Sequence, residues 1–353
     1  QGLLAHTCLA VRIEQWNATG EPEVTLAGVF GQECWAREMP QGTRKERKKL
    51  KRKKAAASCP RESDRWARAL RETRGPPAQA QWTLVADREC DIFEVMMQCA
   101  DQGVQWVLRA SQSRKTVPLD LSIFEAVAQA PVQGGYTIPL RARPGVAARN
   151  ARVELRAVQT AIRPPRELQA RCAPLPTGLV EVREVAPPEG VEPIHWLLLT
   201  SWPCATYDQT RRVIQGYACR WLIEEYHKAL KTGTNIEDSQ LSTATRIQAL
   251  LAIHTVVAAE LLQLKLLANT RPDEAIGPDT LAPESIAVLE IKYGRPATGW
   301  TNRNLMTTIA RMGGYLARKH DGPPGWLSIW RGCLKLQMMT EGYVLAIPLQ
   351  TCG

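Results

Sequence analysis

Five polar side chains, of the kinds that bind phosphate or a metal ion beside it, recur at helical spacing within the segment 207–233. Because an α-helix advances about 100° per residue, they fall within roughly 80° of one another on one face. A carboxylate can hold a divalent cation, a guanidinium can bind phosphate through two hydrogen bonds, and an ammonium adds positive charge. The pattern is compatible with phosphate chemistry, although such a mixed-charge face is more often solvated surface with pairs at i and i+4. The five residues are Tyr217, Arg220, Glu224, Lys228 and Lys231.

The element that must position these side chains is a single helix predicted over 207–232. Its opposite face is apolar, and Gly233 is a residue type suited to ending a helix. The sequence therefore predicts a helix that buries one side and presents the polar side. The apolar face comprises Ala218, Cys219, Leu222, Ile223, Tyr226, Ala229 and Leu230.

The remaining elements predict a protein of mixed α and β structure. Two runs rich in strand formers, 3–13 and 24–36, flank a turn-like stretch and predict an antiparallel hairpin. The proline-rich segment 112–203 contains short alternating runs, which predict a β-rich insertion with extended connections. Further helices are predicted over 60–72, 91–100, 244–268, 284–293, 301–319 and 325–341, and further strands over 81–86, 104–110, 179–185 and 194–200.

Composition excludes several classes of protein. The chain has 353 residues, 45 Lys+Arg, 35 Asp+Glu, a net charge of +10 and 44% hydrophobic residues. These values exclude intrinsic disorder, collagen-like repeats and a small disulfide-rich scaffold. Nine basic residues and one acid occupy 44–54, so most of the net charge lies in one run. Net charge alone therefore does not establish a polyanionic partner.

Cysteine spacing and hydropathy indicate the redox compartment and whether the chain spans a membrane. The ten cysteines are scattered without a zinc-binding spacing, which predicts free thiols in a reducing compartment. The most apolar stretch, 247–267, contains His254, Glu260 and Lys265, which argues against a membrane span. We therefore expect no membrane partner.

Several motifs together resemble one family. The spacing Tyr217-x2-Arg220-x3-Glu224-x6-Lys231 matches the Y-(2)-R-(3)-E-(6)-K signature of a subgroup of DDE transposases. The chain resembles the insertion-sequence-four family, and most closely its transposon-five type. VADRECDIFE at 85–94, HWLLLT at 195–200, RWLIEEYHKALKTG at 220–233 and ARMGGYLARKHDGPPGWLSIW at 310–330 also read like family segments. The resemblance covers nearly the whole chain.

The resemblance implies an α/β fold (α+β, with a mixed sheet) of ribonuclease-H-like type. It implies that this core lacks its first strand and is followed by a helical C-terminal domain. The expected layout is a first part of the catalytic core at 1–111, the β-rich insertion at 112–203, catalytic core helices at 204–270, and a helical dimerisation region at 271–353.

The resemblance also implies roles for individual residues. Asp87 and Glu224 are the expected catalytic carboxylates and would bind Mg²⁺ or Mn²⁺. The residues expected to bind DNA are Tyr217, Arg220, Lys231, Lys228 and Arg109, with Trp196 stacking on an unstacked base. Each has a structural alternative: Asp87 as a surface acid paired with Arg109, Trp196 as a core residue, and Lys228 as an ordinary surface lysine.

One family residue has no counterpart. In the family the first catalytic Asp stands on strand one, whereas the first Asp here is Asp64, which belongs to the helix predicted at 60–72. A two-metal site needs a carboxylate that bridges ions about 3.5–4 Å apart and a further carboxylate for each ion. We therefore expect an incomplete site. We also expect a chain that folds poorly alone, or a longer product beginning upstream of Gln1.

The function implied is that of a cut-and-paste transposase catalytic region, truncated and inactive as numbered. Its expected partners are double-stranded DNA at transposon ends, target DNA and a second copy of the chain, in bacterial cytoplasm at the nucleoid. The segment 100–175 contains eleven basic and five acidic residues. This excess of positive charge supports a polyanion partner, or else it marks a solvated loop. The alternatives are a non-catalytic DNA-binding and dimerising protein derived from a transposase, and a metal-dependent nuclease without strand transfer.

Overall fold

The computed structural model describes residues 3–17, 20–36, 62–73, 75–140 and 147–350, and it shows a mixed α+β protein. The chain divides into two compact units. The sheet unit comprises Trp16–Pro22 and Glu38–Arg220, and the hairpin unit comprises Gln1–Gln15, Glu23–Arg37 and Trp221–Gly353. The basic run 44–54 lies outside the described residues.

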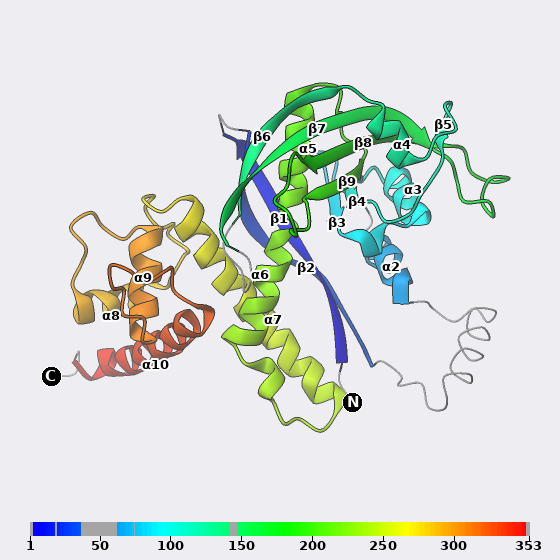
Figure 1. Ribbon diagram of the computed structural model, residues 1–353. Coiled ribbons are helices and arrows are strands. Elements are labelled where there is room, and N and C mark those ends of the chain that lie inside the picture. The colour runs from blue at the N-terminus through cyan, green and yellow to red at the C-terminus, as the bar shows by residue number, and fades with distance from the viewer. Residues whose placement is uncertain (1–2, 18–19, 37–61, 74, 141–146, 351–353) are drawn as a thin grey trace. The chain divides into compact units, whose positions relative to one another are not determined.

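The sheet unit is built on a seven-stranded mixed sheet (Figure 1). The strand order is β3-β4-β9-β8-β7-β5, and β6 pairs with β7. β3 and β4 are parallel, whereas the other pairs are antiparallel. Among the described strands, β3 pairs with β4 alone and is an edge strand. The strands are β3 (Thr83–Ala86), β4 (Gln105–Arg109), β5 (Thr116–Val117), β6 (Val132–Leu140), β7 (Arg149–Ile162), β8 (Leu175–Glu184) and β9 (His195–Thr200).

Helices cover both faces of this sheet. Successive strand residues point to opposite sides, so apolar side chains on both faces are available to pack against helices. Leu108 packs in one core with α2, α3 and α4, whereas its neighbour Val107 packs in another core with α5. Leu199 and Leu198 divide between the two cores in the same way. The helical elements are η1 (Glu62–Asp64), α2 (Arg65–Glu72), η2 (Arg88–Cys90), α3 (Phe93–Asp101), α4 (Ile123–Ala128) and α5 (Tyr207–Ala218).

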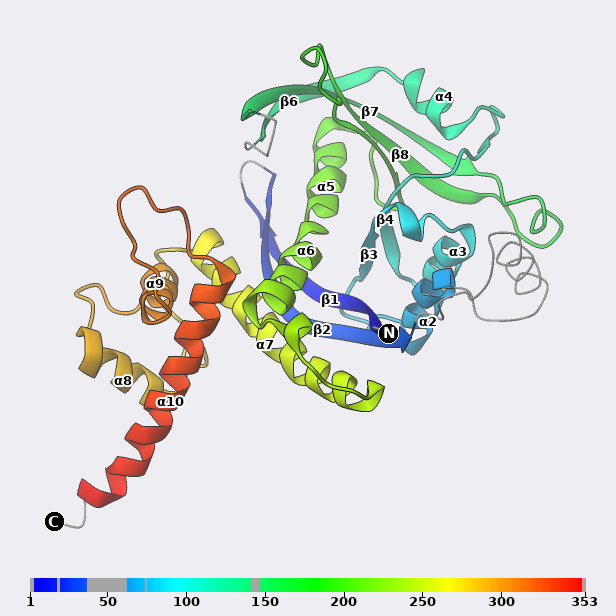
Figure 2. The ribbon, with the colours of Figure 1, turned by 60° about the horizontal axis from the view of Figure 1, so that its bottom comes forward.

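The hairpin unit packs a two-stranded ribbon against helices, and Figure 2 shows α7 lying along the ribbon. The Leu26 backbone N–H donates to the Gln263 side chain at 2.8 Å, and the Thr255 hydroxyl donates to the Gln32 side chain at 3.2 Å. The elements are β1 (Leu3–Trp16), β2 (Pro22–Ala36), α6 (Trp221–Lys228), the π-helix η3 (Ala229–Gly233), η4 (Ile236–Asp238), α7 (Ala244–Thr270), α8 (Pro283–Tyr293), α9 (Asn302–Met312) and α10 (Trp326–Gln350).

Within the described part of the chain, α7 is the one helix long and apolar enough, by length and composition, to cross a membrane. The core helix of a soluble protein meets the same test. Ala258, Leu261 and Leu262 are buried in the core of the hairpin unit, whereas Ile253 and Val256 are exposed. α7 therefore contributes one face to a protein core.

α9 and α10 approach each other through two glycines. A Cβ built at Gly313 would lie 1.8 Å from the Ser328 carbonyl oxygen, and one built at Gly332 would lie 1.8 Å from the Ile309 carbonyl oxygen. Real Cβ atoms do not come this close to backbone atoms. Glycine at both positions is therefore a requirement of this helix crossing.

The predicted helix 207–232 was wrong as a single element, although helix formation over most of it is confirmed. α5 ends at Ala218, where the N–H groups of Cys219 and Arg220 donate to carbonyls three residues earlier, at 3.2 and 3.0 Å. α6 then begins at Trp221 and ends at Lys228, and a π-helix continues from Ala229 to Gly233. Tightened bonds of this kind are common at helix ends, and apolar periodicity does not reveal them.

Most other predicted elements are confirmed, with shifted ends. The hairpin, the strands near 81–86 and 104–110 and the helix at 244–268 are present, and segment 112–203 is rich in β structure. The strands of that segment extend the sheet that contains β3 and β4, because β9 pairs with β4. The cysteines within the described residues are not joined in disulfide bonds; they are Cys8, Cys34, Cys90, Cys99, Cys172, Cys204, Cys219 and Cys333.

A buried ion pair in the sheet predicts a measurable pH dependence. Arg149 donates to the Glu184 carboxylate through both guanidinium Nη atoms, and the Ile194 N–H donates to it at 2.9 Å. The hydrogen bond from Arg149 holds the pKa of Glu184 below its usual range. A lowered pKa in the folded state adds stability above the unfolded-chain value, about 4.3, and this stability is lost as the pH falls through the folded-state value.

We therefore expect Glu184→Gln to remove part of the acid sensitivity of folding. Urea unfolding at about pH 7 and about pH 3 should show a larger loss of unfolding free energy for the wild type than for Glu184→Gln. Glu192→Gln changes an exposed side chain and should behave like the wild type. Equal losses in all three proteins would contradict the assignment.

Candidate phosphate-binding site

The topology of the sheet unit brings three of the predicted site residues to one edge. β3 and β4 are parallel, so their carboxyl ends meet there, with Asp87 directly after β3 and Arg109 as the last residue of β4. β9 runs antiparallel to β4, with Arg109 opposite Leu198, so the start of β9 and Trp196 lie at this same edge. The directions of the three strands therefore bring Asp87, Arg109 and Trp196, which are far apart in sequence, to the same edge of the sheet.

Asp87 caps the short helix that follows β3. Its carboxylate accepts a hydrogen bond from the Glu89 N–H at 3.0 Å, and its side chain is half-buried. Among the described residues no ion pair joins Asp87 to Arg109, so the structural alternative proposed for this pair lacks a direct contact here. In the part of the chain that the structure describes, a backbone N–H, and no cation, contacts this carboxylate.

Arg109 is the centre of a group of positive charges. Its Nη2 donates to the His195 carbonyl at 3.2 Å, and its buried Nε has no hydrogen-bond partner among the described residues. Burial lowers the pKa of Arg109, and the charge of Arg88 lowers it further. Tyr217 opposes this through a hydrogen bond, whereas Arg220 adds to the lowering. Two further guanidiniums and a buried tyrosine thus act on Arg109, and guanidinium groups suit the geometry of a bound phosphate.

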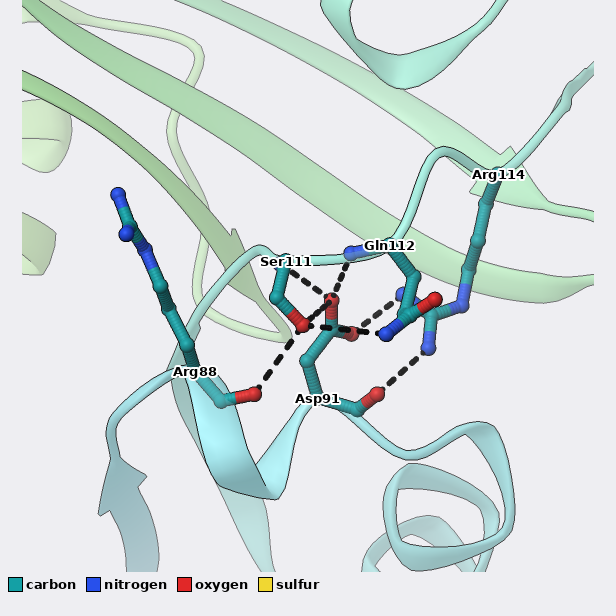
Figure 3. A network of polar contacts seen from close by, with 5 residues as sticks. All are labelled: Arg88, Asp91, Ser111, Gln112 and Arg114. Atoms are coloured by element: carbon teal, nitrogen blue, oxygen red, sulfur yellow. Dashed lines mark hydrogen bonds and ion pairs between the residues drawn. The ribbon is translucent and has the colours of Figure 1, made fainter. Parts of the chain in front are cut away.

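Arg88 is a member of this cluster that sequence reasoning missed. Its guanidinium extends away from the Asp91 carboxylate (Figure 3), and its charge acts on Arg109. The signal was present, because Arg88 stands beside Asp87 in the motif at 85–94. In that motif the family resemblance singles out only the carboxylate.

An aromatic pair borders the guanidiniums. The rings of Trp196 and Tyr217 lie 6.0 Å apart between centroids, at an angle of 59°, and the Arg220 guanidinium carbon lies 5.8 Å from the Tyr217 ring centroid. Tyr217 is only 5% exposed, so the prediction that it lies on an open polar face was wrong. Its ring packs in the core between α5 and the sheet, and Trp196 packs against the same core while remaining partly accessible.

The other predicted residues belong to the hairpin unit. Lys228 pairs with Glu225 at 2.6 Å, and Lys231, on the π-helix, pairs with Glu237 at 2.8 Å. Burial lowers the pKa of His227, with a further lowering from Lys231 and an opposing effect from Glu224. Glu224 and Lys231 therefore both act on one histidine. Both lysines have intrachain acidic partners that a bound phosphate would have to displace.

The residues described contain no group of three or more His, Cys, Asp and Glu side chains that could hold a metal ion. Asp87 offers one carboxylate on the sheet unit, and Glu224 offers one on the hairpin unit. A two-metal site needs a third carboxylate that bridges the ions. The described residues thus do not complete the donor set of a two-metal centre.

Several arginines of the basic segment 100–175 have structural partners. Arg114 pairs with Asp91, Arg149 with Glu184 and Arg163 with Asp120, and Arg156 donates to the Ala130 carbonyl at 2.6 Å. Arg141 and Arg143 lie outside the described residues. The positive charge of this segment, for which a polyanion partner and a solvated loop were both open, is therefore partly used within the fold.

The chain matches no protein-family model.

Proposed function

We propose that this chain is a DNA-binding transposase-type protein whose sheet unit holds the phosphate backbone at the edge formed by β3, β4 and β9. One observation carries the proposal. Arg88, Arg220 and the buried Tyr217 all act on Arg109, and Trp196 lies beside Tyr217 with its ring centroid 6.0 Å away. Guanidiniums suit phosphate geometry, and an accessible aromatic face suits an unstacked base.

The sheet unit supports the ribonuclease-H-like part of the proposal. A parallel strand pair has an Asp at the end of one member, and helices cover both faces of the sheet. In this type of fold such strand ends carry the catalytic carboxylates. The proposed likeness to a ribonuclease-H-like fold rests on the order of elements and on the position of Asp87. Measuring the chemistry of the site tests it further.

The activity proposed is cleavage and transfer of DNA strands. Mg²⁺ or Mn²⁺ is the metal proposed, with Asp87 and Glu224 as ligands. Because the described residues do not complete that donor set, the roles we derive concern phosphate alone. Arg109 and Arg88 bind phosphate oxygens, Tyr217 orients the Arg109 guanidinium, and Trp196 stacks on a base.

The same incomplete donor set favours the second candidate, a non-catalytic DNA-binding and dimerising protein derived from a transposase. The partners proposed are double-stranded DNA at transposon ends, target DNA and a second copy of the chain, at the bacterial nucleoid. The apolar side chains exposed on α8 and α10 support self-association; they are Ile291, Leu334, Met338 and Leu345.

The proposal is tested by Arg109→Gln. Duplex DNA binding should weaken about tenfold, because a charged hydrogen bond contributes about 1.5–3 kcal/mol. The slope of log K against log salt should fall by about one, since each neutralised phosphate contributes about 0.9. Titration of a labelled duplex at several salt concentrations measures both quantities.

The matched control is Arg163→Gln, an arginine of the same unit that pairs with the exposed Asp120. It should leave the salt slope at the wild-type value. The site is misassigned if the two variants give the same affinity and slope. With Mn²⁺ present, joined DNA products would support the transposase, cleavage alone would support the nuclease, and binding without either would support the non-catalytic protein.

A further inference from the structure

A buried carboxylate lies behind the phosphate site and belongs to none of the roles described above. Asp91 follows η2, and its side chain is fully buried. Its Oδ2 accepts from the Ser111 N–H at 2.5 Å, the Gln112 N–H at 2.7 Å and the Ser111 hydroxyl at 3.2 Å (Figure 3). Arg114 donates to Oδ1 through Nη1, and to the Asp91 carbonyl through Nη2 at 2.8 Å.

This network ties the turn after β3 to the turn after β4. Asp91 lies four residues after Asp87, and Ser111 lies two residues after Arg109. The Ser111 hydroxyl also donates to the Arg88 carbonyl at 3.1 Å. One carboxylate therefore holds both strand extensions that carry the candidate site.

The backbone pairing of β3 with β4 does not by itself hold together the segments that follow these strands. The pairing of β3 with β4 ends at Ala86 and Leu108. Asp87 and Arg88 lie beyond that last pair, on an edge strand that has no second neighbour among the described strands. Their placement relative to Arg109 depends on contacts made after the strands end, and the Asp91 network supplies these contacts.

We propose that Asp91 is a positioning residue that sets Arg88 and Asp87 against Arg109 and thereby shapes the site for phosphate. The inference rests on the proposed function for its ligand, and on the geometry alone for the ordering of Arg88 and Arg109. A carboxylate accepts at both oxygens, whereas an amide nitrogen cannot accept. Asp91→Asn therefore loses either the two backbone donors or the Arg114 contact while keeping the shape of the side chain.

The experiment compares the full-length wild type with Asp91→Asn and with Glu184→Gln. Glu184 is a matched control because it is another buried carboxylate of the sheet unit that accepts from an arginine and a backbone N–H. Two properties are measured on folded protein: the Kd for a duplex oligonucleotide together with its binding stoichiometry, and the order of the Arg88 and Arg109 Nε–Hε groups by ¹⁵N relaxation.

For Asp91→Asn we expect the Kd to rise about tenfold at unchanged stoichiometry, as found for residues that orient a binding group. The order of the Arg109 Nε–Hε group should fall, whereas Glu184→Gln should change neither quantity. A purely structural role would lower the folded fraction and the stoichiometry and leave the Kd unchanged. That result, or equal effects in both variants, would overturn the proposal.

A milder variant keeps the test decisive if Asp91→Asn does not fold. Ser111→Ala removes the hydroxyl bonds to Asp91 and Arg88 and leaves the backbone donors in place. We expect its Kd to rise about threefold. If the wild type binds no duplex, the proposed function fails. The relaxation measurement then decides the positioning role alone, and unchanged order of Arg88 and Arg109 in both variants refutes it.

Discussion

Gly332→Ala is expected to lower the free energy of unfolding of the hairpin unit by about 3 kcal/mol or more, because the added methyl cannot be accommodated without moving a helix. Its Cβ would lie 1.8 Å from the Ile309 carbonyl oxygen and 2.7 Å from the carbonyl carbon. Both are backbone atoms of α9, so no side-chain rotation relieves the overlap. α9 and α10 would have to separate, which exposes the apolar surface between them.

Gly342→Ala provides the control within the same helix. No atom lies within 4 Å of a Cβ built at Gly342, so this change should stabilise α10 by up to about 1 kcal/mol through helix propensity. Urea unfolding monitored by circular dichroism, together with hydrogen exchange in α9 and α10, measures both variants. The close crossing would be disproved by a Gly332→Ala protein as stable as the wild type.

Arg114→Met should also be strongly destabilising, by about 3–5 kcal/mol, since it leaves a buried carboxylate without its cation. The Asp91 side chain is fully buried and that of Arg114 is 10% exposed, so water cannot replace the lost charge. Methionine keeps much of the apolar volume of the arginine stem. The loss therefore reports the charge and its hydrogen bonds more than packing.

The comparison is Arg163→Met, which removes a pair of the same chemistry from the surface. The side chains of Arg163 and Asp120 are 40% and 61% exposed. Surface pairs of this kind contribute about 0–1 kcal/mol. Chemical denaturation of the two variants should thus give clearly different midpoints, and similar midpoints would contradict the burial-based argument.

The sequence predicted the short strands of the sheet more accurately than it predicted the long helix over 207–232. Strands β3 and β4 followed from short apolar runs, and their ends gave the positions of Asp87 and Arg109 without knowledge of the sheet order. The helix 207–232 was predicted from periodicity, which averages over several turns. It therefore missed the break at Cys219–Arg220 and the burial of Tyr217, both of which depend on how α5 packs on the sheet.

The candidate site was partly visible from the sequence. The family resemblance singled out Asp87, Arg109 and Trp196, and the structure places all three at strand ends or starts. The ion-pair partners of Lys228 and Lys231 depend on the fold of the chain around η3. Residue spacing could not reveal that these lysines pair with Glu225 and Glu237. The contribution of Arg88 depends on which way the turn after β3 faces, and the contacts that join this turn to the one after β4 exist only in the folded chain.

The π-helix at Ala229–Gly233 changes what a residue count means in this segment. Each of its turns encloses one residue more than an α-helical turn, so side chains beyond it are out of phase with those before it. Tyr226, Ala229 and Leu230 nevertheless stay buried in the same core. Lys231 consequently sits at a different azimuth from the one an unbroken α-helix would give it relative to Glu224. Two chains that share this motif letter for letter would present different surfaces if only one of them contained the wider turn.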